Sequence, residues 1–131
     1  MKIVVTGGSG FIAQQLASSL LQQGHHVYAT LRRDSKINSL YEHNNLIYRF
    51  VDYSDTNQLV NLFQGSDSII HLAGLAHKQK LIDNCDFEAF HNANVLTTLN
   101  IVEAAQLAHI KRFIFISSAG PAELIKIKRL I

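Results

Sequence analysis

The sequence predicts an α/β fold in which about five parallel strands form a doubly wound sheet, in the order 3-2-1-4-5. Three observations lead to this prediction. A short apolar strand, Lys2-Ile3-Val4-Val5, runs into a glycine-rich turn and then into a helix. Strand and helix patterns alternate along the chain with no linker or low-complexity segment between them. The run at Ile69-Ile70 is continuously apolar, as expected of a parallel strand covered on both faces.

The glycine-rich stretch runs from Thr6 to Ala13 and contains Gly7, Gly8 and Gly10. Behind it, apolar residues recur at helical spacing from Ile12 onward. Glycines allow the backbone to approach a ligand closely, and a helix N-terminus offers unpaired N–H groups to a phosphate. The stretch therefore favours a dinucleotide pyrophosphate site. The alternative is a tight strand-to-helix turn that binds nothing.

The remaining elements follow from apolar periodicity and from capping residues. The first helix is expected to close near Gly24, and Asp55 is expected to cap a helix that runs to about Phe63. We expect further strands over 26–31, 46–51, 67–72 and 112–117, and a long helix over 86–108. This gives a Rossmann-type sheet with its ligand crevice at the carboxyl ends of the first and fourth strands. Residues 1–119 form the predicted NAD(P)-binding domain. The basic and apolar tail, 120–131, is expected to form a short amphipathic helix with Leu124, Ile127 and Ile131 on one side.

Composition excludes several classes of protein. The 131 residues carry a formal charge of +2, and residues 1–122 hold nine basic and nine acidic side chains, so there is no nucleic-acid footprint beyond Arg32-Arg33. Cys85 is the only cysteine, which fits a reducing compartment, and no apolar run is long enough to span a bilayer. We therefore expect a cytoplasmic protein with no membrane partner. His71 is expected to be a packed histidine, and its spacing to His77 and Cys85 matches no metal site.

The residues after the second and third strands bear on the cofactor. Arg32 and Arg33 stand where a carboxylate would accept bonds from the adenosine ribose, and arginines there suit a 2′-phosphate. NADP is therefore favoured over NAD, with a solvated turn as the alternative. Asp52, with Tyr53 beside it, is placed to meet the adenine amino group; the alternative for Asp52 is a turn or capping aspartate.

Five ordered motifs together resemble the extended short-chain dehydrogenase/reductase superfamily, in particular its NAD-dependent epimerase/dehydratase branch with the UDP-glucose 4-epimerase-like enzymes. The resemblance extends to Ala119 and covers the N-terminal half of such an enzyme. Its motifs are Thr6–Ala13, Asp52, His71-Leu72-Ala73-Gly74, Asn94-Val95 with Thr98 and Asn100, and Phe113–Ser118.

The resemblance implies roles for individual residues. Phe11 and Ile12 would lie against the pyrophosphate, Asn94 near the active site, and Ser118 would hydrogen-bond the substrate. Ala13 replaces the third glycine of the loop, a mild change. The expected cofactor-binding residues are Gly7, Gly10, Phe11, Ile12, Ala13, Arg32, Arg33, Asp52, Tyr53, Leu72, Ala73, Gly74, Ala76, Asn94 and Ser117.

One departure from the family concerns catalysis. The family uses a Tyr-x-x-x-Lys pair after the fifth strand, whereas no tyrosine follows Tyr53 here and the substrate domain has no counterpart. We expect the cofactor-binding portion of an epimerase, dehydratase or reductase acting on a sugar nucleotide or a related hydroxy or keto substrate, truncated and catalytically incomplete. The alternatives are a non-catalytic NADP(H) sensor and a non-functional fragment. The apolar 86–108 helix predicts a homo-oligomer contact.

Overall fold

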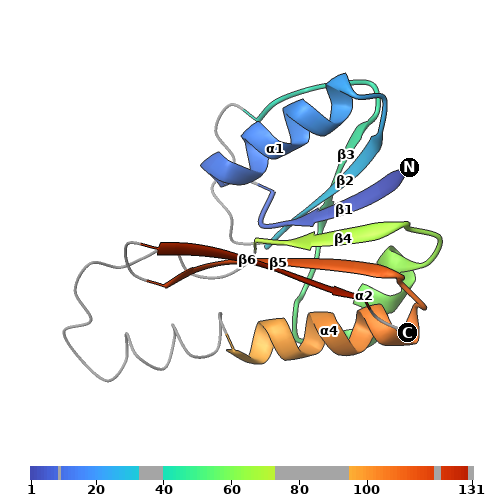
Figure 1. Cartoon of the computed structure of the whole chain (residues 1–131). Coiled ribbons are helices and arrows are strands. Elements are labelled where there is room, and N and C mark those ends of the chain that lie inside the picture. Colours follow the sequence, from blue (N-terminus) through green and yellow to red (C-terminus); the bar gives the residue numbers. More distant parts are fainter. Residues whose placement is uncertain (9, 33–39, 73–94, 120–121, 130–131) are drawn as a thin grey trace.

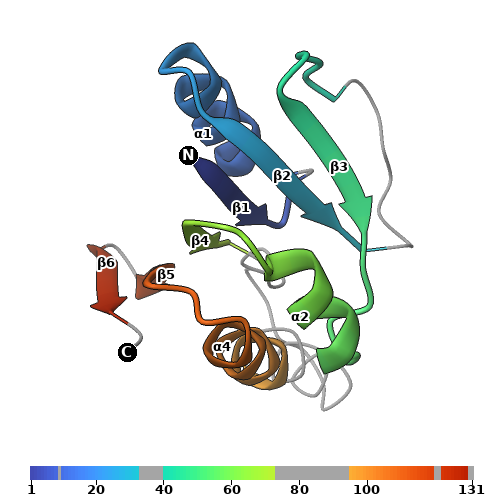
Figure 2. The same ribbon diagram turned by 90° about the vertical axis from the view of Figure 1, so that its right-hand side faces the viewer.

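The computed structural model describes residues 1–8, 10–32, 40–72, 95–119 and 122–129. They form one sheet with helices on both faces (Figure 1). Figure 2 shows α1 on one face, and α2 and α4 together on the other. The elements are β1 (Lys2–Thr6), α1 (Phe11–Gln22), β2 (His26–Leu31), β3 (Leu46–Phe50), α2 (Thr56–Phe63), β4 (Ser68–His71), α4 (Thr97–Leu107), β5 (Arg112–Ala119) and β6 (Ala122–Arg129).

The strand order is β3-β2-β1-β4-β5-β6, and the first five strands are parallel. This confirms the predicted 3-2-1-4-5 order. The register places Thr6 opposite Thr30 and Val5 opposite Ile70. The carboxyl ends of β1, β2 and β4 therefore meet at one edge of the sheet, where ligands of such folds bind.

Local signals set the helix boundaries. Gly24 has φ +89°, a conformation that side-chain-bearing residues rarely adopt, and it follows the end of α1 as predicted. Asp55 caps α2, with its side chain accepting a hydrogen bond from the backbone N–H of Gln58 at 3.1 Å. The described part of the long helix is α4, and the predicted portion over 86–94 lies outside the described residues.

The predicted tail helix is wrong. Residues Ala122–Arg129 form β6, which pairs antiparallel with β5, so that Ile114 lies opposite Ile127 and Ile116 opposite Ile125. The sequence Ile125-Lys126-Ile127-Lys128 alternates with period two, and β-branched residues favour strands. That alternation outweighs the helical spacing of Leu124, Ile127 and Ile131, because β5 offers β6 a complete ladder of backbone partners.

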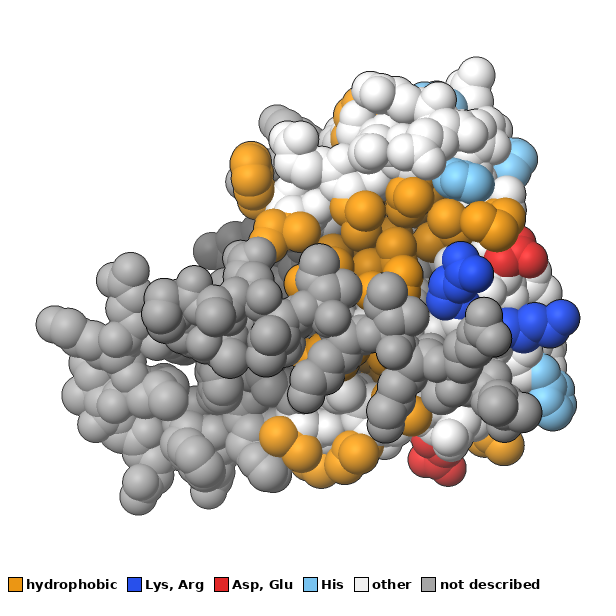
Figure 3. All heavy atoms as spheres, in the orientation of Figure 1, with side chains coloured by type: hydrophobic (Ala, Val, Ile, Leu, Met, Phe, Trp, Pro, Cys, Tyr) orange, Lys and Arg blue, Asp and Glu red, His pale blue; other side chains and the backbone are white. Residues whose placement is uncertain are grey.

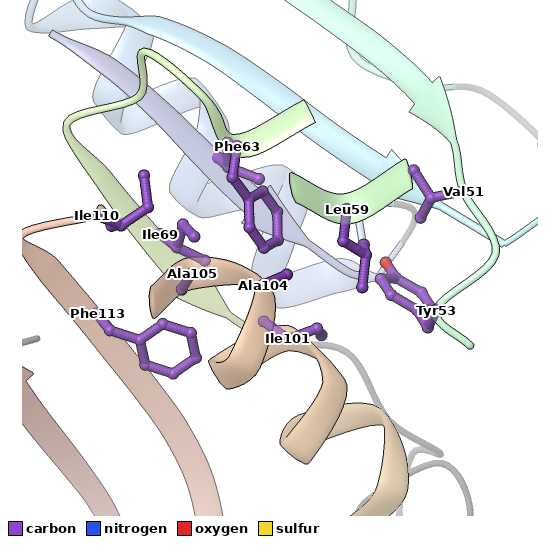
Figure 4. Packing of buried hydrophobic residues seen from close by; sticks show 11 residues of the cluster. Val51, Tyr53, Leu59, Phe63, Ile69, Ile101, Ala104, Ala105, Ile110 and Phe113 are labelled. Atoms are coloured by element: carbon purple, nitrogen blue, oxygen red, sulfur yellow. The ribbon is translucent and has the colours of Figure 1, made fainter. Parts of the chain in front are cut away.

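The core is divided between the two faces of the sheet. Val4 and Ile69 point toward α2 and α4, where Phe63, Leu59 and Ile101 are fully buried (Figure 4). Val5 and Ile70 point to the opposite face, with the buried side chains Ala13, Ala17 and Leu21 of α1. Alternate residues of each strand thus anchor helices on opposite faces, as a parallel sheet requires.

Hydrophobic side chains are also exposed on α4 and just before it. Figure 3 shows hydrophobic side chains along the lower edge of the molecule, where α4 lies in Figure 1. Val95, Leu96, Leu99 and Leu107 are between 41% and 59% exposed. This helix therefore buries one side against α2 and the sheet and leaves apolar side chains uncovered by the described residues.

Candidate functional site

The glycine-rich loop is packed tightly against the end of β2. Gly7 has φ +75°, and the backbone N–H of Gly10 donates to the Gly7 carbonyl at 3.0 Å, closing the turn. The backbone N–H of Gly8 donates to the Thr30 carbonyl at 2.7 Å. A Cβ on Gly8 would lie 2.7 Å from the Ala29 Cβ, so only glycine fits there. The turn needs Gly7 for its backbone angle and Gly8 for its packing.

The first turn of α1 follows this loop and presents unpaired donors. Gly10 is the N-cap and makes no side-chain capping bond, and the first turn contains no acidic residue. Among the described residues, no acceptor reaches the backbone N–H of Phe11 or Ile12. Both side chains are exposed, at 80% and 55%, whereas Ala13 is buried against the sheet. The helix end thus combines free N–H groups, the positive end of a dipole and exposed apolar side chains.

Tyr53 lies beneath the loop. Its ring is 6% exposed within the α2–α4 core, and its hydroxyl lies 2.5 Å from the Thr30 Oγ1. The backbone N–H of Gly7 donates to the same hydroxyl at 3.4 Å. Burial raises the pKa of the Tyr53 phenol above its usual value, so the group is neutral at physiological pH. Tyr53, which was expected to bind the cofactor beside Asp52, therefore lies under the backbone of the loop.

A second polar group joins β1, β4 and α4. His71 is 1% exposed; its Nδ1 lies 2.8 Å from the Thr6 Oγ1 and its Nε2 lies 2.8 Å from the Thr98 Oγ1. The Thr6 hydroxyl also accepts from the backbone N–H of Leu72 at 2.9 Å. Burial lowers the pKa of His71 to about 4, so the imidazole is neutral at physiological pH. His71 is a packed histidine, as expected, and links the end of β4 to the long helix.

Asp52 makes the contacts of a turn residue. Its Oδ1 accepts hydrogen bonds from the backbone N–H of Ser54 at 2.9 Å and from the Ser54 hydroxyl at 2.6 Å. Its own backbone N–H donates to the Gln58 Oε1 at 2.7 Å. These contacts match the turn alternative for Asp52, and its contact with adenine stays a prediction.

Arg32 directly follows β2 and is exposed. Because Gly8 is bonded to Thr30, the end of β2 lies next to the glycine-rich loop, with Arg32 two residues further on. The role predicted for Arg32 at the adenosine ribose stays a prediction.

The remaining predicted site residues lie at the end of β4, on β5, or outside the described residues. Leu72 is half-buried at the end of β4, and Ser117 and Ser118 lie on β5, where only their backbone is described. The others, Arg33, Ala73, Gly74, Ala76 and Asn94, lie outside the described residues.

Sequence reasoning missed the hydrogen bonds of several polar residues at or beside the loop, including Thr6, which it named only as the first residue of the glycine-rich stretch. Thr6 and Thr30 are fully buried, and both stand at or near the carboxyl ends of strands that carry the loop contacts. Gln14 donates to the Gly8 carbonyl, and to the Tyr48 hydroxyl at 3.2 Å, and accepts from the backbone N–H of Tyr41 at 2.7 Å. A polar residue at the end of an otherwise apolar strand was the available signal for the threonines. Gln14 had no signal, because two of its partners, Tyr41 and Tyr48, are distant in sequence.

Two further findings concern the described residues. They contain no group of three histidine, cysteine, aspartate or glutamate side chains arranged to hold a metal ion. Among them, no helix has the length and apolar character needed to cross a bilayer.

Comparisons with known proteins agree with this geometry. The model of the NAD dependent epimerase/dehydratase family matches residues 3–124. The chain is 38% identical over 118 residues to a protein of Synechocystis sp. described as "Putative dihydroflavonol 4-reductase", covering 88% of this chain and 32% of that protein.

Two solved structures show the same fold. An epimerase from Methanothermobacter thermautotrophicus is 29% identical, with a TM-score of 0.78, and covers 90% of this chain and 35% of its own. MoeE5 in complex with UDP-glucuronic acid and NAD is 28% identical, with a TM-score of 0.74, covering 90% and 37%. The chain spans about a third of the length of the curated relatives it matches.

Proposed function

We propose, for a chain that belongs to the NAD dependent epimerase/dehydratase family, that residues 1–119 bind a nicotinamide dinucleotide with its pyrophosphate on the Gly7–Ala13 loop. The carrying observation is the start of α1, where a glycine turn ends in two backbone N–H groups without described acceptors. A pyrophosphate supplies the missing acceptors and the negative charge that the helix dipole favours. The chain then serves as the cofactor-binding part of an epimerase, dehydratase or reductase.

We further propose that the bound form is NADP. Arg32 is exposed at the end of β2, beside the loop, where it would face the adenosine ribose. A guanidinium donates two parallel hydrogen bonds to a phosphate, whereas the ribose hydroxyls of NAD are better served by a carboxylate acceptor. MoeE5 was solved with NAD, so this proposal names a different cofactor from the one in that structure, and it rests on Arg32.

The proposed chemistry is hydride transfer between the nicotinamide and a substrate carbon that carries an oxygen. UDP-glucuronic acid in MoeE5 supports a sugar nucleotide as the substrate class. Ser118 would donate a hydrogen bond to the substrate oxygen. Proton exchange with that oxygen needs an acid–base group, typically worth ~10²–10⁴ in rate. This proposal therefore assigns cofactor binding to residues 1–119 and names no acid–base group, since no tyrosine follows Tyr53 in these 131 residues.

We also propose that α4 contributes to a homo-oligomer contact. Leu99 is 59% exposed on the helix, and Val95 and Leu96 just before it are 41% and 46% exposed. Clustered apolar side chains of this kind mark interaction surfaces. Leu99→Glu should shift the oligomer distribution toward monomer in sedimentation experiments; a wild-type chain that is monomeric at high concentration contradicts the proposal.

Calorimetric titration with NADP and NAD tests the binding proposal. Two glycine variants separate affinity from stability, since each is expected to change only one of the two. Gly10 has φ −72° and ψ 157°, and an added Cβ would meet only the Gly7 carbonyl at 3.4 Å. Gly10→Ala should therefore keep the stability of the free protein but hinder pyrophosphate approach, weakening binding roughly tenfold or more. Gly24→Ala, at φ +89° and away from the loop, should lower stability and leave affinity unchanged. Absence of saturable binding to wild-type protein refutes the proposal.

A further inference from the structure

Two consecutive backbone N–H groups of the glycine-rich loop donate hydrogen bonds to Tyr53 and Thr30, which also contact each other. The Gly7 N–H reaches the Tyr53 hydroxyl and the Gly8 N–H reaches the Thr30 carbonyl, while the Tyr53 hydroxyl and the Thr30 Oγ1 lie in hydrogen-bond contact. We infer that Tyr53 is a positioning residue, whose hydroxyl holds Gly7 in the conformation that accepts the pyrophosphate. This inference rests on the proposed binding of a dinucleotide.

Tyr53 is itself held in place at both ends. Its ring packs in the core beside Leu59 and Val51 (Figure 4). Its backbone carbonyl accepts from the Asn100 Nδ2 of α4 at 3.0 Å. Because packing fixes the Tyr53 ring and α4 fixes its main chain, the Tyr53 hydroxyl is held directly under the loop. The position of Gly7 is therefore tied to the core and to the helix on the far side of the sheet.

The hydrogen-bonding capacity of the phenol suits this task. A tyrosine hydroxyl has one hydrogen to donate and also accepts, so it can accept from the Gly7 N–H and share one hydrogen with the Thr30 hydroxyl. Without this oxygen, the part-buried Gly7 N–H loses its acceptor in a residue whose φ of +75° is not fixed by a side chain. The loop would then sample other conformations before the ligand arrives, and ordering it would cost affinity.

The site of this support predicts which ligand contacts change. Tyr53 acts on the loop backbone, where NAD and NADP carry the same pyrophosphate, and not on the ribose phosphate that distinguishes them. Tyr53→Phe should therefore weaken binding of NAD and NADP by the same factor. The loss of one hydrogen bond corresponds to roughly a three- to tenfold change in Kd.

The test uses Tyr53→Phe, Thr30→Val and the double variant in the full chain. Thr30→Val removes the Oγ1 partner but keeps the backbone carbonyl that Gly8 uses. Tyr28→Phe is the matched control, since Tyr28 lies on β2 two residues before Thr30, and no described residue forms a hydrogen bond with its hydroxyl. The readouts are Kd for NAD and for NADP, Tm, and the amide shift of Gly7 in the free protein.

Tyr53→Phe should weaken binding of NAD and NADP equally and should change the amide chemical shift of Gly7. The double variant should lose no more binding free energy than the two single variants lose together. Tyr28→Phe should change none of these quantities. Wild-type affinity in Tyr53→Phe overturns the inference while the proposed function stands. Unequal losses for NAD and NADP also overturn it, because the hydroxyl would then act at the ribose end. If Tyr53→Phe does not fold, wild-type affinity in Thr30→Val overturns it instead. No binding by wild-type protein overturns the proposed function and this inference with it.

Discussion

Acidification should destabilise this domain through His71. The buried imidazole has its pKa lowered from 6.5 to about 4, so the unfolded chain binds more protons than the folded one between those values. The stability that depends on neutral His71 is fully present above about pH 6.5 and is lost as the pH falls toward about 4. At about 1.4 kcal/mol per pKa unit, the loss is about 2 kcal/mol at pH 5 and about 3 kcal/mol once the folded imidazole is protonated.

The structural reason is the burial of His71, which is 1% exposed at the end of β4. Its two nitrogens already face the hydroxyls of Thr6 and Thr98, and the ring of Phe115 lies edge-on with centroids 5.2 Å apart. Protonation would place a charge in this buried site, and burial makes that charge costly.

Urea unfolding at pH 7 and at pH 5 measures the effect in wild type and His71→Gln. His71→Gln is expected to lower the free energy of unfolding at both pH values. The readout is therefore the change in that free energy between pH 7 and pH 5 in each protein. Wild type should lose about 2 kcal/mol more than His71→Gln. The exposed His26→Gln is the control and should follow wild type. Equal losses in wild type and His71→Gln would refute the reasoning.

Three further predictions concern the glycine-rich loop, the cap of α2 and the end of β2. Gly8→Ala forces its Cβ to 2.7 Å from the Ala29 Cβ and should lower stability by roughly 1–3 kcal/mol in thermal or urea unfolding; an unchanged midpoint would contradict the packing described. Asp55→Ala removes the cap on α2 and should lower the free energy of unfolding by about 1 kcal/mol in the same assay, whereas Asp55→Asn should retain most of the wild-type stability. Arg32→Ala should weaken NADP binding by roughly tenfold and leave NAD binding unchanged, and equal losses would remove the basis for the NADP preference.

The order of the elements was predictable because each local signal agreed with the fold. The second strand was predicted with the bounds that the structure shows, His26–Leu31, and the Asp55 cap and Gly24 turn are where the sequence placed them. In each case the residues that determine where an element begins or ends lie next to that point in the sequence. The 3-2-1-4-5 order followed from the same agreement, since alternating strands and helices leave few right-handed arrangements.

The tail was mispredicted for a different reason. Its helical and strand patterns both fit, and the choice depended on a pairing partner, β5, which precedes it in the sequence. Strand pairing is decided by tertiary context more than by intrinsic preference. The two-residue alternation of isoleucine and lysine was the better guide.

The candidate site was predictable where backbone chemistry defines it and not where side chains support it. Glycine spacing located the loop and the start of α1. The hydrogen bonds of Tyr53 to Gly7 and Thr30 join residues 46 and 23 positions apart, and no local pattern encodes such contacts. The same holds for the Thr6–His71 contact, which spans 65 positions. Sequence alone therefore indicated what binds, whereas the residues that shape the binding loop required the fold.

The most direct test of the account follows the backbone amides of Gly10, Phe11 and Ile12 by NMR while NADP is added. Binding of the pyrophosphate at the start of α1 predicts that these amides shift most, with saturation at the affinity measured by calorimetry. ADP, which also carries a pyrophosphate, should shift the same amides. Saturable shifts confined to other parts of the chain, or no shifts at these three amides, would contradict the central claim.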